Sequence, residues 1–154
     1  MIQMFHVTKS YDSSTHALTD ITLKIPKGDF LFITGPSGAG KSTLLKIMFG
    51  SEAPTSGQII LDGRNYVKIP ASEIPILRRR IGFVFQDFKL ISNKTVFENV
   101  ALSLQVMGVD PVETKKRVLR MLSYVKLQHT ANFRPLGLSG GEQQRVAIAR
   151  ALVK

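Results

Sequence analysis

Cysteine is absent from the 154 residues of the chain. Neither disulfides nor thiolate metal sites can therefore form. No run of about 18 or more apolar residues occurs, so the sequence predicts no membrane-spanning helix. The first residues, Met1 to His6, also lack the basic and then apolar pattern of a secretory signal. Together these absences predict a cytoplasmic globular protein.

Acidic residues are scarce. Asp and Glu number 11 against 21 Lys and Arg, which makes the net charge +10. Such an excess of positive charge is typical of proteins that bind nucleic acid, an anionic membrane surface or an acidic partner. The alternative is that the charges are dispersed over solvated helix faces. Part of it is clustered in residues 78–80 and in Lys115, Lys116, Arg117 and Arg120. Neither cluster is interleaved with aromatic side chains, so nucleic acid is less favoured than a membrane surface or an acidic partner.

The apolar pattern alternates along the chain between that of strands and that of helices. Strands are predicted over 2–8, 17–25 and 58–61, and the continuous apolar runs at 30–33 and 81–85 predict strands buried on both faces. Helices are predicted over 42–49, 72–80, 95–107, from Asp110-Pro111 onwards, and over 139–154. This order predicts an α/β fold with a largely parallel sheet flanked by helices and an antiparallel β patch beside it.

A glycine-rich motif separates the predicted strand at 30–33 from the next helix. The full pattern G-x-x-x-x-G-K-[ST] is matched by Gly35, Pro36, Ser37, Gly38, Ala39, Gly40, Lys41 and Ser42. Glycines let successive backbone N–H groups point into one concavity that suits phosphate oxygens, and the helix N-terminus adds its positive dipole end. The motif therefore predicts binding of ATP or ADP. The alternative, a turn without a ligand, is disfavoured because a strand precedes the motif and a helix follows it.

The residues at the end of this motif have separable roles. Lys41 supplies a mobile charge for the β- and γ-phosphates. Ser42 supplies a hydroxyl for Mg²⁺, and Thr43 is placed to help hold the α-phosphate. The predicted cofactors are therefore ATP or ADP and Mg²⁺.

A second motif, Leu138 to Leu152, opens the last predicted helix. Ser139 with Glu142 three residues later has the pattern of a capping box. That pattern does not explain Gly140 and Gly141, because glycines in the first turn reduce helix stability. They are explained if another group, such as an anion, must approach the N–H donors of this helix end closely.

With both motifs in view, the chain resembles the nucleotide-binding domain of ABC ATPases over its whole length. The resemblance implies a P-loop NTPase fold, with approximately 1–86 and 139–154 in the β part and 87–138 in the helical part. It also implies a head-to-tail homodimer with ATP between the subunits. The signature residues that would complete the partner's ATP site are Ser139, Gly140, Gly141 and Glu142.

Two further residues match the family. Tyr11 lies where the family has an aromatic residue that stacks on adenine, and the alternative is an aromatic side chain packed on the core. Gln86 ends the predicted strand at 81–85 and corresponds to a glutamine that contacts Mg²⁺ and the attacking water. The resemblance thus assigns Lys41 and Gln86 to catalysis, and Ser42 and Gln86 to the metal. By contrast, His6, His16 and His129 are interpreted as surface or packing residues.

Residues 78–90 and 95–101 most resemble the subgroup of this family that acts in bacterial cell division. The alternative is the ATPase of lipoprotein-releasing or macrolide-exporting systems. The resemblance implies a peripheral protein on the inner face of the plasma membrane. Through the segment after Gln86, it would couple ATP binding and hydrolysis to an integral membrane subunit of the FtsX type. A nucleic-acid-linked ABC-type ATPase is less favoured, because residues 43–137 contain neither long heptads nor cysteine.

The resemblance also implies groups that the sequence does not contain. A Walker B strand, with an aspartate for Mg²⁺ and a general-base glutamate, would follow residue 154. Phosphoryl transfer needs the metal held and the water oriented. We therefore expect this chain to be part of a longer protein and to bind nucleotide with little hydrolysis. We also expect the strand at 30–33 to lack a neighbour along one edge.

Overall fold

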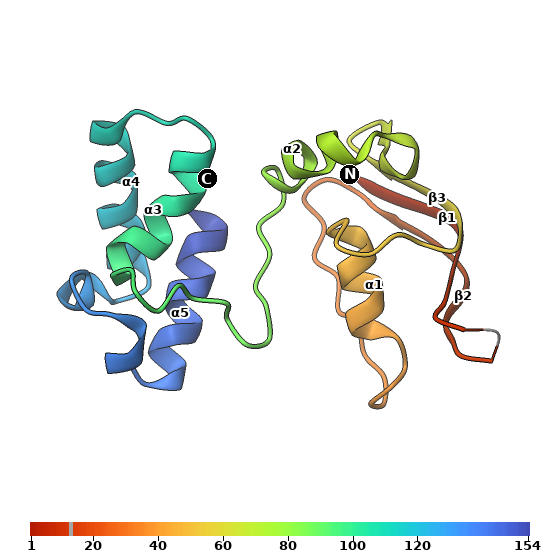
Figure 1. Cartoon of the computed structure of the whole chain (residues 1–154), viewed down its shortest axis with the longest axis horizontal. Helices are drawn as coiled ribbons and strands as arrows, with labels where there is room; N and C mark the ends of the chain where they lie inside the picture. Colours follow the sequence, from red (N-terminus) through yellow and green to blue (C-terminus); the bar gives the residue numbers. More distant parts are fainter. Residues whose placement is uncertain (13) are drawn as a thin grey trace. The chain divides into compact units, whose positions relative to one another are not determined.

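A computed structural model of the chain describes residues 1–12 and 14–154. The chain forms two compact units, Met1–Arg78 and Arg79–Lys154 (Figure 1). No helix in the described part of the chain is long and apolar enough to cross a bilayer. The sequence predicts that residues 139–154 belong with the β part of the domain, and this assignment stays a prediction. The compact units themselves divide after Arg78.

The first unit is built on an antiparallel sheet of four strands in the spatial order β2-β1-β3-β4. The strands are β1 (Ile2–Ser10), β2 (His16–Ile25), β3 (Ser56–Leu61) and β4 (Arg64–Asn65). Met4 of the central strand β1 pairs with Leu23 of β2 and with Ile59 of β3. An irregularity follows at His6, whose φ is 50°, and it returns Val7 to the core after two outward-facing residues.

Helix α1 (Lys41–Met48) lies against β2 in the same unit (Figure 1). It buries Leu44, Ile47 and Met48, which recur at the three- and four-residue spacing of one helix face. The unit continues through short helices η1 (Tyr66–Lys68), η2 (Ala71–Glu73) and α2 (Ile74–Arg78). The helix predicted over 72–80 is thus two short pieces, with Pro75 tolerated near the start of the second.

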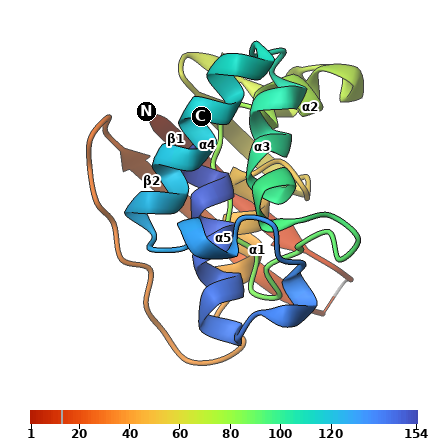
Figure 2. The same cartoon turned by 90° about the vertical axis from the view of Figure 1, so that its left-hand side faces the viewer.

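The second unit contains α3 (Val96–Val106), α4 (Pro111–Tyr124) and α5 (Gly140–Leu152), with short helices η3 (Gln128–Thr130) and η4 (Pro135–Gly137) between the last two (Figures 1 and 2). Helix α3 packs against both α4 and α5. One apolar cluster joins the three helices, and it includes Val100, Leu104, Val118, Leu122 and Val146. The predicted cap of α4 is confirmed: the Asp110 carboxylate accepts from two backbone N–H groups, and Pro111 occupies the first helical position.

The two buried strands predicted at 30–33 and 81–85 do not form in the described residues, and the sheet there is antiparallel throughout. Phe30 and Phe32 are 80% and 77% exposed, although a strand buried on both faces was predicted. A parallel strand takes its backbone hydrogen bonds from strands distant in the sequence, which an apolar run cannot supply by itself. The predicted parallel sheet is therefore not formed in the described residues, whereas the antiparallel patch predicted beside it is present as the sheet of β1 to β4.

Candidate functional site

The glycine-rich motif lines a hollow of about 360 Å³ in the first unit. Its walls are Ser37, Gly38, Ala39, Gly40, Lys41, Ser42 and Thr43 from the motif and α1, with Tyr11, Thr15, His16 and Ala17 from the β1–β2 hairpin. The sequence predicts that the eight residues of this motif, Thr43 and Tyr11 belong to one nucleotide site. The structure brings Tyr11 together with residues 37–43.

Gly40 fixes the turn from the loop into α1. It is the N-cap of the helix and has φ 83°, in the left-handed region that favours glycine. A Cβ at this position would also collide with the backbone oxygen of Ala17. Conformation and close approach both demand glycine here, so this position sets how the loop lies against the hairpin.

Lys41 folds back over the loop. Its ammonium group donates to the backbone oxygens of Gly35 at 2.8 Å and Pro36 at 2.6 Å. The first turn of α1 contains no acidic residue, so nothing there offsets the positive end of the helix dipole. A half-buried ammonium at the N-terminus of a helix that has no side-chain cap hydrogen bond favours an anion in this hollow.

Tyr11 faces the hollow and is not a core residue, because it is 55% exposed. Its hydroxyl donates to Glu52 Oε2 at 2.7 Å and lies 3.3 Å from Thr43 Oγ1. The Lys9 ammonium lies 5.2 Å from the ring centroid, over one face of the ring. The alternative interpretation of Tyr11 as a residue packed on the core is therefore wrong.

Three residues that line the hollow were missed by sequence analysis: Thr15, His16 and Ala17. His16 was interpreted as a surface or packing residue, and it is exposed; its Nδ1 hydrogen-bonds Ser10 Oγ at 2.8 Å across the hairpin, at the edge of the hollow. Asp12 Oδ1 accepts from the backbone N–H of Thr15 at 2.6 Å. Hydrogen bonds from Ser14 and Thr15 lower the Asp12 pKa to about 2. The three missed residues could have been predicted from the hairpin, because the hairpin returns the chain beside Tyr11.

The second predicted motif forms the N-terminus of α5 in the second unit. Its capping box is present: Ser139 Oγ accepts from the Glu142 N–H, and Glu142 Oε2 accepts from the Ser139 N–H at 2.9 Å. The Ser139 hydrogen bonds lower the pKa of the Glu142 carboxyl. A Cβ added to Gly140 would meet no atom within 4 Å, and one on Gly141 only Arg145 Nη1 at 3.9 Å. Nothing in the described chain therefore requires glycine at these positions.

The segment after Gln86 is held by two helices of the second unit. Arg150 of α5 donates to the backbone oxygens of Phe88 and of Lys89, the latter at 2.8 Å. Both of these residues have positive φ, 58° and 46°. Asn99 of α3 is fully buried, accepts from the Ile91 N–H at 2.8 Å and donates to the backbone oxygen of Thr95 at 2.9 Å. These bonds give the segment a defined shape. Gln86 itself is exposed.

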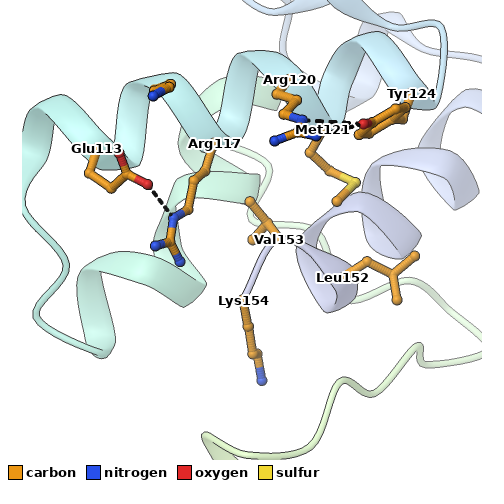
Figure 3. A pocket seen from close by; sticks show the side chains of 9 residues that line it. Glu113, Arg117, Arg120, Met121, Tyr124, Leu152, Val153 and Lys154 are labelled. Carbon is orange, nitrogen blue, oxygen red and sulfur yellow. Dashed lines mark hydrogen bonds and ion pairs between the residues drawn. The ribbon is translucent and has the colours of Figure 1, made fainter. Parts of the chain in front are cut away.

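A second hollow, of about 430 Å³, lies between α4 and the end of α5 (Figure 3). It contains four cations, but three are engaged within the unit. Arg117 pairs with Glu113 at 2.7 Å, Arg120 donates to the Tyr124 hydroxyl at 3.1 Å, and Lys154 donates to the Ile81 oxygen at 2.8 Å. Burial also lowers the pKa of Lys154. The lining of this hollow includes no residue of the glycine-rich loop, and the hollow at residues 37–43 remains the candidate site.

Comparison with known proteins agrees with this geometry. The sequence profile of the ABC transporter family matches residues 18–154. The chain belongs to the ABC transporter family. Its relatives include proteins named cell division ATP-binding protein FtsE from Bacillus subtilis, Mycobacterium tuberculosis and Escherichia coli, at 51%, 49% and 44% identity. Each alignment covers 99% of this chain and 67%, 67% and 69% of the relative, respectively.

Solved ABC cassettes have the same fold. The dimeric structure of a post-hydrolysis state of the ATP-binding cassette MJ0796, bound to ADP and Pi, is 42% identical and superimposes with a TM-score of 0.93. The alignment covers 99% of this chain and 69% of the chain in that structure. The P-loop NTPase fold and the resemblance to FtsE are thereby confirmed. This ABC chain spans about two thirds of the length of the relatives it matches.

Proposed function

We propose that the hollow at the glycine-rich loop binds ATP or ADP together with Mg²⁺. The observation that carries this proposal is the Lys41 ammonium folded over the loop at an α1 N-terminus free of acidic residues. Such an arrangement presents N–H donors and a mobile charge to phosphate oxygens. A related cassette binds ADP and Pi, which supports the same ligand class here.

The proposed roles follow the position of each residue. Phosphates are held by the loop, Gly35, Pro36, Ser37, Gly38, Ala39 and Gly40, with Lys41 and Thr43. Tyr11 stacks on adenine through the ring face that Lys9 leaves open. Ser42 and Gln86 hold Mg²⁺, and Gln86 also contacts the attacking water, so Lys41 and Gln86 are the catalytic residues of this chain.

The N-terminus of α5 serves a second subunit. Ser139, Gly140 and Gly141, with Glu142 in the capping box, complete the ATP site of the partner in a head-to-tail homodimer. The open space around both glycines supports this role, because close approach by an external group explains their lack of side chains. The dimeric state of the related cassette supports it as well.

The parent protein is an ATPase subunit that couples ATP binding and hydrolysis to an integral membrane subunit of the FtsX type in bacterial cell division. The names of three relatives support the cell-division role over the exporter alternative. The subunit lies peripherally on the inner face of the plasma membrane. The segment after Gln86, held by Arg150 and Asn99, is the contact surface for the membrane subunit.

Coupling is tested by phosphate release from the full-length parent, alone and reconstituted with its membrane subunit in lipid nanodiscs. We expect the membrane subunit to change the rate several-fold, because it acts on a segment next to Gln86. The Lys41→Ala parent is the background control. A rate that is the same with and without the membrane subunit contradicts the coupling role but leaves nucleotide binding untouched.

A further inference from the structure

Tyr11 is anchored to the loop after α1 by a chain of polar contacts. Its hydroxyl proton is donated to Glu52 Oε2 at 2.7 Å. The other carboxylate oxygen, Oε1, lies 3.1 Å from the Lys46 ammonium in the last turn of α1. Because the single Tyr11 proton goes to Glu52, Thr43 must be the donor in its 3.3 Å contact with the Tyr11 hydroxyl.

The loop that carries Glu52 is itself fixed to the end of α1. Gly50 has φ 73°, and the Ser51 N–H and hydroxyl both donate to the Lys46 backbone oxygen, at 2.9 Å and 3.1 Å. Glu52 is more protected from solvent than Lys46, with side-chain exposures of 22% and 51%. The Tyr11 hydrogen bond lowers the pKa of Glu52, with a smaller contribution from Lys46. Glu52 is therefore an ionised acceptor at neutral pH.

The network joins the β1–β2 hairpin to both ends of helix α1. Helix α1 has Lys41 and Ser42 at its first turn and Lys46 near its end. Tyr11 belongs to the hairpin and bonds to the helix at Thr43 and, through Glu52, at Lys46. These bonds therefore fix the distance between the Tyr11 ring and the phosphate loop.

We propose that Glu52, held by Lys46, is a positioning residue that fixes the Tyr11 ring at the spacing an adenine nucleotide requires. This role rests on the proposed binding of nucleotide at the same hollow. Glu52 acts through Tyr11 and touches no phosphate. It therefore contributes to recognition of the base and not of the triphosphate.

The affinities of the chain for ATP and for inorganic tripolyphosphate, measured by calorimetry, separate these contributions. Tyr11→Phe keeps the ring and removes its anchor. We expect ATP affinity to fall about five- to tenfold, within the range for losing one typical hydrogen bond, with tripolyphosphate affinity unchanged. Glu52→Ala should lower the ratio of the two affinities equally, and the double variant should be no worse than either single one.

Controls separate positioning from charge. Removing a carboxylate near an anion site for electrostatic reasons alone would tighten both ligands, so a raised ATP affinity in Glu52→Ala contradicts the proposal. Glu52→Gln retains an oxygen acceptor and should recover most of the ratio. Glu73→Ala removes an exposed carboxylate that does not line the hollow and should leave the ratio at the wild-type value.

The outcomes distinguish this role from nucleotide binding itself. A folded wild-type chain that binds neither ligand overturns the proposed function and the positioning role with it. Binding of both ligands by wild type, with an unchanged ratio in Tyr11→Phe, overturns the positioning role alone. If Glu52→Ala fails to fold, Tyr11→Phe decides the question, since it removes only the hydroxyl of an exposed residue.

Discussion

Replacing Lys41 by alanine is expected to lower ATP affinity more than about 100-fold, or about 2.7 kcal/mol. The ammonium already lies over the loop, where it donates to the Gly35 and Pro36 oxygens. Charge-assisted hydrogen bonds contribute about 1.5–3 kcal/mol each, and the variant loses those that Lys41 makes to the β- and γ-phosphates. The fold should persist, because Lys41 is only half-buried and is not part of the apolar core.

Isothermal titration of wild-type and Lys41→Ala chains with Mg-ATP measures this loss. Lys27→Ala is the matched control, since it removes an exposed lysine of the same unit that does not line the hollow. It should bind ATP as wild type does, and thermal unfolding should be similar for all three chains. Equal affinity of the Lys41→Ala and wild-type chains would refute the assignment of the phosphate loop.

The second large effect is expected from Ser139→Arg in the full-length parent. The substitution places a long cationic side chain next to Gly140 and Gly141. These are the residues that the nucleotide of a partner subunit is proposed to approach closely. ATP-driven pairing should be abolished, while ATP binding by the monomer should be retained because the loop belongs to the other unit. Loss of the serine cap alone is expected to destabilise α5 by only about 1 kcal/mol.

Size-exclusion chromatography with light scattering, with and without ATP, reports pairing. Ser123→Arg introduces the same side chain at an exposed site of α4 and should pair normally. Ser139→Ala removes the cap without adding bulk, and its unfolding temperature measures how much stability is lost with the cap alone. Wild-type pairing by Ser139→Arg would be inconsistent with a trans role for this helix end.

Local signals predicted much of this fold from the sequence. Asp110-Pro111 marks the start of α4, and Ser139 with Glu142 marks the start of α5, because capping depends on residues within one turn. The segments at 30–33 and 81–85 were predicted wrongly as strands. Their apolar runs show that they can be buried, but the hydrogen bonds that make a strand come from partner strands elsewhere in the sequence.

Much of the candidate site could also be predicted from local signals in the sequence. The loop from Gly35 to Ser42 follows from its motif, since glycine conformation and the lysine charge are local properties. His16 and Glu52 were missed because each acts through a contact made by the folded chain: one across the hairpin and one from the loop after α1. No sequence pattern links Glu52 to Tyr11, 41 residues away.

We infer that the glycine-rich hollow binds adenine nucleotide. The most direct test is calorimetric titration of the 154-residue chain with Mg-ATP, with phosphate release followed in the same sample. Saturable binding at one site per chain is predicted, with negligible phosphate release, because no general-base glutamate is identified in these residues. Absence of binding by a chain that circular dichroism shows to be folded would contradict the claim.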